Sequence, residues 1–154
     1  SHMGFVTEAL LYAAARAEHV EQIIEPALQA GKVVLCDRFV YSSLVYQGYA
    51  RQIGVDKILK LNQIATKGLQ PDVYLFIDIP LELSMQRRQL RIKEDGIIQD
   101  RIESEHQDFQ FKVYEGYHQL LNTIPKLYTI SGVGNPMEIH KKLIKKLDPL
   151  VFER

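Results

Sequence analysis

The sequence predicts an α/β fold with a mainly parallel sheet. Segments with the apolar spacing of helices alternate along the 154 residues with short apolar runs that are typical of strands. The runs at residues 32–36 and 71–79 are apolar at almost every position, as expected for strands buried on both faces of a parallel sheet. A third strand is expected at residues 126–131. This alternation favours three layers, with helices covering both faces of the sheet.

Helices are expected between and around these strands. The first covers residues 8–29, because Thr7 is a suitable N-cap, an apolar helical stripe follows, and Gly31 is a suitable stop. The other expected helices are at residues 55–66, closed by Gly68, and at residues 81–95, 109–124 and 136–150.

Composition limits the classes of function. Nineteen Lys and Arg balance 19 Asp and Glu, so no global field indicates a nucleic-acid or membrane partner. No stretch approaches the roughly 18 apolar residues that a membrane span requires. Cys36 is the only cysteine; we interpret it as a small buried core residue and expect a cytoplasmic protein. Residues 1–3 are typical of an expression-tag remnant, and residues 4–154 are expected to form a single domain.

Residues 36–51, CDRFVYSSLVYQGYAR, carry more hydrogen-bonding groups than a turn needs. We interpret them as a loop that follows an expected strand, and ligands of open α/β sheets bind beyond the carboxyl ends of strands. Asp37 can hold a magnesium ion through water, and Arg38 can grip phosphate oxygens with a bidentate fork. A structural ion pair is the simpler explanation of an Asp-Arg pair alone. The hydrogen-bonding side chains that follow are suited to a nucleobase and a sugar: Ser42, Ser43, Tyr46 and Gln47.

The stretch DRFVYSSLVYQGYAR resembles the segment after the third strand of thymidylate kinases, which phosphorylate dTMP. TEALLYAAARAEHV resembles the helix that precedes this strand in the family. QPDVYLFIDIPLELSMQRR resembles the family's fourth strand and following helix, and DRIESEHQDFQFKVYEGYHQLL its lid and the helix after it. The resemblance implies a fold of the P-loop nucleoside monophosphate kinase type. It also implies the reaction of ATP and dTMP to ADP and dTDP, with Mg²⁺ and ATP as cofactors.

The resemblance assigns roles to individual residues. Tyr12 would stack on thymine, and Arg16, four residues later on the same helix face, would reach a carbonyl oxygen of the base. Arg38 would hold the 5′-phosphate, and Asp37 would assist a magnesium ion. Gln47 would read the base edge together with Arg16. The remaining side chains of the cradle, which would line the sugar and base, are Ser42, Ser43 and Tyr46.

A polar segment at residues 96–108 corresponds to the lid and is expected to be mobile. The helix before it is basic and offers three cations that could stabilise a transferring phosphoryl group. A solvated basic face explains the same residues equally well. The candidate cations are Arg87, Arg88 and Arg91.

The pattern G-x-x-x-x-G-K-[ST] does not occur in the sequence: Gly31-Lys32 is followed by Val33, and Pro26 occupies the earlier glycine position. Such a loop cradles the ATP phosphates, so we expect the first strand and P-loop to be missing and kinase activity to be low or absent. The resemblance places the missing strand at the centre of the sheet, which favours a rearranged sheet or a strand-swapped homodimer. Two alternatives remain: a non-catalytic nucleotide-binding or regulatory module, and an interaction protein that pairs through orphaned sheet edges.

Overall fold

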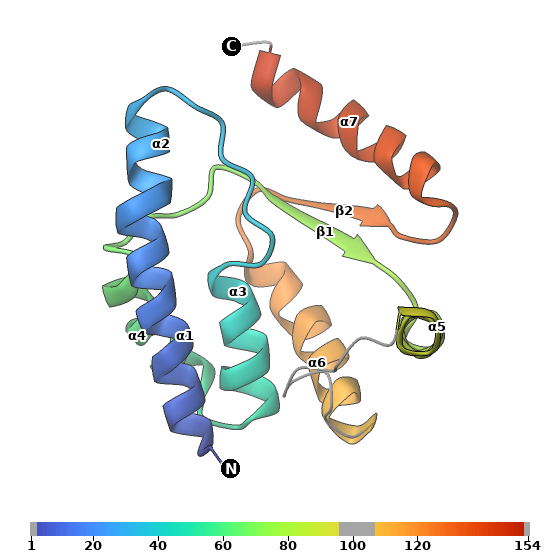
Figure 1. Cartoon of the computed structure of the whole chain (residues 1–154), viewed down its shortest axis with the longest axis horizontal. Coiled ribbons are helices and arrows are strands. Elements are labelled where there is room, and N and C mark those ends of the chain that lie inside the picture. Colours follow the sequence, from blue (N-terminus) through green and yellow to red (C-terminus); the bar gives the residue numbers. More distant parts are fainter. Residues whose placement is uncertain (1–2, 96–106, 153–154) are drawn as a thin grey trace. The chain divides into compact units, whose positions relative to one another are not determined.

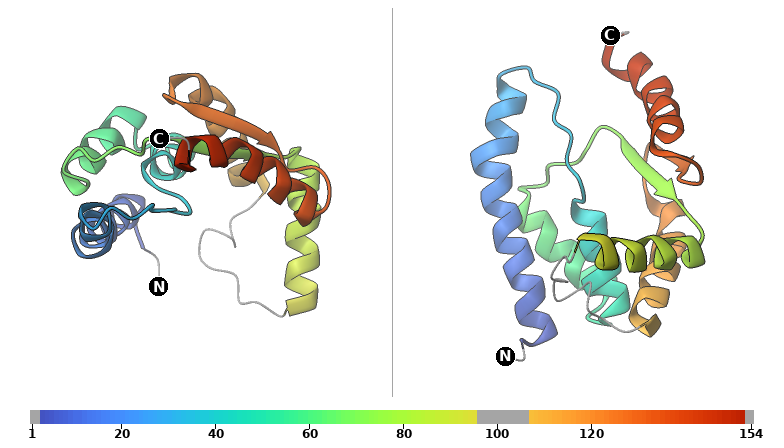
Figure 2. Two further views of the ribbon diagram at one scale, coloured as in Figure 1. Left: turned by 90° about the horizontal axis from the view of Figure 1, so that it is seen from above. Right: turned by 45° about the vertical axis from the view of Figure 1, so that its right-hand side comes forward.

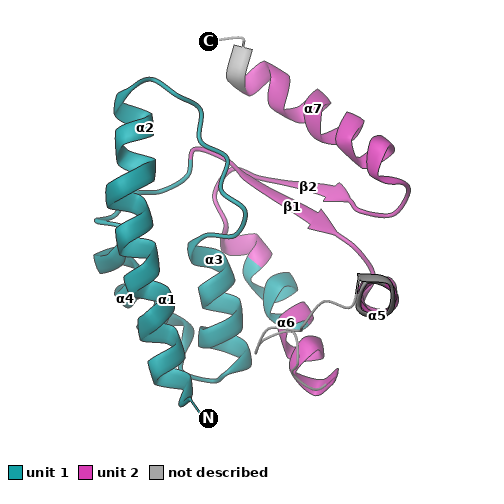
Figure 3. Ribbon diagram, viewed as in Figure 1, with its two compact units in different colours: residues 1–71, 115–120 teal, residues 72–114, 121–154 magenta. Residues whose placement is uncertain are grey.

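The computed structural model describes residues 3–95 and 107–152, with side chains described up to residue 90 and from 107 to 150. Figure 1 shows the chain, which forms the two compact units coloured in Figure 3. The first consists of residues 1–71 and 115–120, and the second of residues 72–114 and 121–154. The fold is mixed α/β and mostly helical, and its described strands form one parallel two-stranded sheet.

The first unit begins with one continuous helical run of three segments: α1 (Phe5–His19), the π-helical η1 (Val20–Ile24) and α2 (Glu25–Gln29). The run remains continuous in the further views (Figure 2). It ends at Gly31, as predicted, because Gly31 has a φ of 71° that glycine adopts without steric cost. The predicted N-cap was wrong. The amide of Glu8 donates to the carbonyl of Gly4 at 3.0 Å, so the helix starts earlier and Thr7 lies inside it.

Residues 32–36, predicted as a buried strand, have no regular secondary structure. Val33 is 65% exposed and Leu35 is 79% exposed. A β-branched run forms a strand only where a neighbouring strand pairs with its backbone, and no described residue forms a ladder with this run. For the same reason Cys36, predicted to be a core residue, is exposed. Both predictions were wrong.

The next segment, interpreted from the sequence as a loop, is largely helical. It consists of α3 (Val40–Ser43) and the π-helical η2 (Leu44–Ala50), and α4 (Val55–Ala65) follows. The prediction for α4 is confirmed, and Gly68 closes it with a φ of 77°. These helices share a core with α1, in which each fully buried aliphatic side chain contributes about 1.5–3 kcal/mol. Its buried members are Ala9, Val40, Leu44 and Ile58.

The second unit contains the sheet. Strands β1 (Tyr74–Asp78) and β2 (Leu127–Ser131) are parallel, with Tyr74 opposite Leu127 and Asp78 opposite Ser131. Both strands lie where the sequence predicted them, although β1 is only partly buried, since a two-stranded sheet covers less of each strand than the predicted larger one. Gly132 extends the ladder by donating its amide to the Asp78 carbonyl at 2.7 Å.

The remaining helices lie at their predicted positions. They are α5 (Leu81–Asp95), α6 (Gln107–Leu120), the short 3₁₀ segment η3 (Leu121–Thr123) and α7 (Pro136–Phe152). Helix α7 packs against β2, and only the C-terminal part of α6, residues 115–120, belongs to the first unit. Most of the predicted mobile lid, residues 96–106, lies outside the described residues. Among the helices that the structure describes, none has the length and apolar composition needed to cross a membrane.

Candidate functional site

Helix α1 presents Tyr12 and Arg16 one turn apart. The Tyr12 side chain is 42% exposed. Arg16 is partly buried and has two anchors: its Nη1 donates to Oδ1 of Asn62, and its Nη2 donates to the backbone carbonyl of Phe39 at 3.4 Å. Its guanidinium carbon also lies 5.7 Å from the centroid of the Phe39 ring, within cation–π range. Neither anchor was predicted from the sequence.

Burial also affects the charge of Arg16. Desolvation lowers the pKa of the guanidinium, and the nearby Cys36 thiol acts in the opposite direction. Arginine still carries its charge in a protein environment of this kind. Arg16 is therefore a partly desolvated cation that is already held in place, and such a group donates hydrogen bonds more effectively than one in bulk water.

A second group of predicted residues meets around Arg38. The Nε of Arg38 donates to Oγ of Ser42 at 3.5 Å, and its guanidinium carbon lies 4.4 Å from the centroid of the Tyr46 ring. Ser42 Oγ in turn lies 3.1 Å from the hydroxyl of Tyr117, whose ring meets Tyr46 edge to face at a centroid distance of 6.3 Å. Because the Ser42 contact uses only Nε, the two terminal nitrogens can form a fork with an anion. Arg38, Ser42 and Tyr46 are thus brought together, and Tyr117 of α6 joins them.

Arg38 has a φ of 65°, which lies in the left-handed region. Non-glycine residues adopt this conformation uncommonly and at a cost. Here it occurs two residues before α3 begins, at a residue whose side chain stacks on Tyr46 and donates to Ser42. Backbone strain of this type is concentrated at functional sites.

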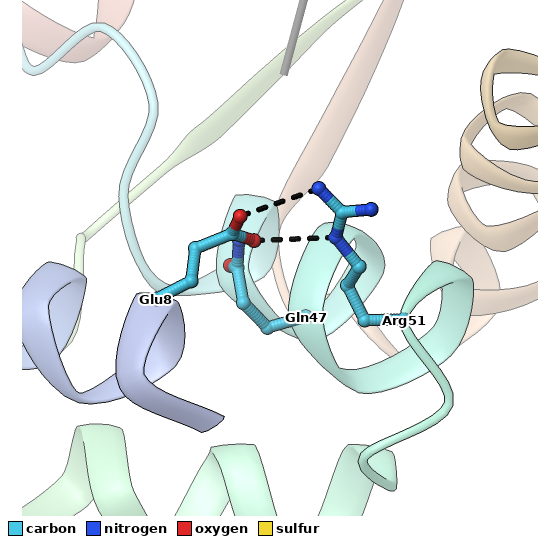
Figure 4. A network of polar contacts seen from close by, with 3 residues as sticks. All are labelled: Glu8, Gln47 and Arg51. Atoms are coloured by element: carbon cyan, nitrogen blue, oxygen red, sulfur yellow. Dashed lines mark hydrogen bonds and ion pairs between the residues drawn. The ribbon is translucent and has the colours of Figure 1, made fainter. Parts of the chain in front are cut away.

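Figure 4 shows a buried network that joins α1 to η2. Glu8, Gln47 and Arg51 are only 4%, 2% and 8% exposed. Glu8 Oε1 accepts from Gln47 Nε2 at 3.1 Å and from Arg51 Nε at 3.3 Å, and Glu8 Oε2 accepts from Arg51 Nη2 at 3.2 Å. Gln47, expected to read the base edge, therefore has a buried partner, Glu8, that was not predicted. The available signal was Glu8 itself, a carboxylate within an apolar helical stripe.

The other predicted residues of the first unit are Asp37 and Ser43. Asp37 is exposed, whereas Ser43 is buried in α3. Among the described residues, no group of three or more His, Cys, Asp or Glu side chains is arranged to hold a metal ion. Mg²⁺ is often held by one or two carboxylates together with water and substrate phosphates, and a single exposed Asp37 fits a ligand set of that kind.

The predicted lid cations belong to the second unit. Arg87 donates from Nη1 to the carbonyl of Gly132 at 3.0 Å and from Nη2 to the carbonyl of Gly134 at 3.3 Å. It therefore fastens the turn after β2. The Nε of Arg88 is buried and has no hydrogen-bond partner in the described part of the chain. The side chain of Arg91 lies outside the described residues.

Comparison with known proteins decides the family. The family profile described as thymidylate kinase matches residues 1–144. The chain belongs to the thymidylate kinase family. It is 49% identical over 140 residues to the thymidylate kinase of Thermoanaerobacter sp. (strain X514), covering 90% of this chain and 66% of that protein.

Two further thymidylate kinases match most of the chain at similar identity. The protein of Synechococcus sp. (strain JA-2-3B'a(2-13)) is 43% identical over 145 residues, covering 94% of this chain and 66% of the relative. The thymidylate kinase of Caldicellulosiruptor saccharolyticus is 38% identical over 152 residues, covering 99% of this chain and 71% of that protein. The chain thus spans about two thirds of the length of these curated relatives.

Within this thymidylate kinase family chain, the residues expected to bind dTMP all belong to the first compact unit. Hydrogen bonds to Asn62 and Phe39 hold Arg16, and Arg38 bonds to Ser42. Gln47 belongs to the buried network of Glu8. The match to the family profile and to these relatives confirms the resemblance seen in the sequence at the level of the family.

Proposed function

We propose that the chain binds thymidine 5′-monophosphate as the acceptor of the family reaction, in which ATP and dTMP give ADP and dTDP. The observation that carries this proposal is the state of Arg16: a partly buried cation anchored one turn beyond an exposed tyrosine ring. A base stacked on such a ring gains about 1–3 kcal/mol. The Arg38 fork supplies the phosphate contact at the other end of the nucleotide.

The chemistry of Arg16 supports a preference among pyrimidines. A guanidinium only donates hydrogen bonds. Thymine and uracil have a carbonyl oxygen at ring position 4, which accepts, whereas cytosine has an amino group there, which donates. A cytosine in the same place would leave a partly buried donor unpaired, and sites that match a polar group discriminate strongly against its absence.

Titration calorimetry with dTMP tests the proposal. We expect saturable heat with the unaltered chain and much weaker binding of dCMP. Arg16→Ala should weaken dTMP binding by about 10–100-fold, because hydrogen bonds to charged groups are worth about 1.5–3 kcal/mol. Lys67→Ala, which removes an exposed cation of the same unit, is the matched control and should leave the affinity unchanged. An unaltered chain that gives no saturable heat would overturn the proposal.

We further propose that the 154 residues alone support little or no turnover, because the phosphate-loop pattern is not among them. In the family reaction Mg²⁺ and ATP supply the phosphoryl group, and Asp37 would contribute one carboxylate to the metal. A coupled assay with ATP and dTMP should show no activity above a mock purification. Activity that appears on adding a separately prepared phosphate-loop segment of a family member would support an acceptor half. Activity without that segment would contradict this proposal.

The exposed apolar run at residues 32–36 favours a second candidate function, pairing with a strand of another chain. A homodimer with a swapped strand and an interaction protein both use such pairing, whereas a non-catalytic regulatory module would instead keep the acceptor pocket. Analytical ultracentrifugation checks the simplest case, for which we expect a dimer of this chain. A monomer at every concentration would exclude the homodimer and leave a different partner as the remaining form of this candidate.

A further inference from the structure

Asn62 of α4 is a buried polar residue in contact with Arg16 of the proposed dTMP site, and no role was predicted for it. Only 1% of it is exposed. Its Nδ2 donates to the carbonyl of Ile58, one turn earlier in α4, at 2.8 Å, and its Oδ1 accepts from Nη1 of Arg16. Asn62 and Arg16 are 46 positions apart in the sequence, so only the folded chain brings them together.

The partners of Asn62 fix the orientation of its amide. The Ile58 carbonyl only accepts, so it faces the NH₂ group, and the Arg16 guanidinium only donates, so it faces the oxygen. If the amide turned over, its oxygen would face the Ile58 carbonyl oxygen and its NH₂ group would face the Arg16 guanidinium. Neither pair can form a hydrogen bond. Helix α4 therefore presents one acceptor, in one fixed direction, to Arg16.

The consequence for Arg16 is preorganisation. A long cationic side chain loses rotamer freedom when a ligand fixes it, and this loss weakens binding. Arg16 is already held at both terminal nitrogens, by Asn62 and by the Phe39 carbonyl, before any ligand is present. Phe39 directly follows Arg38, so the same guanidinium connects α1, α4 and the segment that carries the phosphate-binding candidate.

We propose that Asn62 is a positioning residue for the nucleotide site, which acts on thymine affinity through Arg16 without contacting the nucleotide. This inference deepens the proposed dTMP function and rests on it. A leucine at position 62 would suit the buried surroundings by volume and polarity, but it would offer Arg16 no acceptor. Aspartate would keep an acceptor for Arg16, although it would lose the donor to Ile58.

A double-mutant cycle measured by dTMP titration tests this mechanism. Asn62→Leu is expected to weaken dTMP binding by about 3–10-fold, the effect of one newly mobile side chain. In the Arg16→Ala background, the same substitution should change the affinity by less than about 2-fold, because the group through which Asn62 acts is gone. Asn62→Asp should stay within about 3-fold of the unaltered chain, because its carboxylate still accepts from Arg16. Equal losses in both backgrounds would assign Asn62 a purely structural role and overturn the inference.

A measurement without ligand separates this inference from the proposed function. In nitrogen-15 NMR spectra, a clamped guanidinium gives resolved Nη–H signals, and a freely rotating one gives averaged signals. The Nη–H signals of Arg16 are assigned as those that disappear in Arg16→Ala. They should be resolved in the unaltered chain and in Asn62→Asp, and averaged in Asn62→Leu. Resolved signals in a folded Asn62→Leu variant would overturn the inference whatever the chain binds. Averaging in that variant together with no dTMP binding by the unaltered chain would overturn the proposed function and keep the Asn62–Arg16 clamp.

Discussion

Replacing Glu8 by Gln is expected to lower the free energy of unfolding by about 3–5 kcal/mol, the usual cost of removing one partner from a buried ion pair. The Glu8 and Arg51 side chains are 4% and 3% exposed, so the guanidinium left behind has little access to water. The substitution keeps the size of the side chain. It replaces one acceptor oxygen by a donor that faces either Arg51 or the Gln47 amide. Urea denaturation followed by circular dichroism measures the change.

Two further variants show whether burial is the cause. Lys67 pairs with Glu21 at 3.2 Å and with Glu25 at 3.4 Å, but it is well exposed, and Lys67→Ala should leave the midpoint of denaturation unchanged. Adding Arg51→Met to Glu8→Gln should recover part of the loss, because the unpaired buried cation is then removed as well. A midpoint for Glu8→Gln equal to that of Lys67→Ala would show that this ion pair is not buried in solution.

The elements that the sequence predicted well are those whose signals are local. Helix α5 has the predicted bounds because Pro80 precedes it and its residues favour helix throughout. The strands β1 and β2 were found because each is a short apolar run between turn residues. Gly31 and Gly68 were correctly placed at helix ends, since the positive φ that such ends require is a property of the residue itself.

The predictions that failed depended on what else the chain provides. Residues 33–35 have the composition of a strand, but a strand also needs a neighbour, and a local pattern does not reveal whether one is present. Val40 and Leu44 were assigned to a loop because they follow the run at residues 32–36, which was expected to be a strand. They are core residues of α3 and η2, four positions apart on one helical face.

The side chains that we propose to bind the ligand were chosen from the sequence, whereas the residues that support them became visible only in the structure. Tyr12, Arg16 and Arg38 were chosen by type, spacing and resemblance. Their partners come from distant parts of the sequence: Asn62 from α4 and Tyr117 from α6. Such pairs follow from packing between helices, which neither periodicity nor composition specifies.

The phosphate end of the proposed site gives the largest expected effect on binding. Arg38→Ala should weaken dTMP binding by about 100-fold or more, because two charge-assisted hydrogen bonds of about 1.5–3 kcal/mol each are lost. Arg38→Lys keeps the charge without the planar fork and should recover only part of the affinity. Alanine, lysine and arginine meet the same steric cost at a φ of 65°, so the three chains differ mainly in the group offered to the phosphate.

Thymidine, which lacks the phosphate, separates a phosphate contact from general damage to the site. Arg38 also stacks on Tyr46 and donates to Ser42, so its removal can disturb the base pocket as well. If Arg38 acts on the phosphate, calorimetric titration with thymidine should give the same affinity for all three chains within about 3-fold, a difference well under 1 kcal/mol. Equal losses for thymidine and dTMP would instead make Arg38 a support for Tyr46 and Ser42, and the anion would have to be held elsewhere.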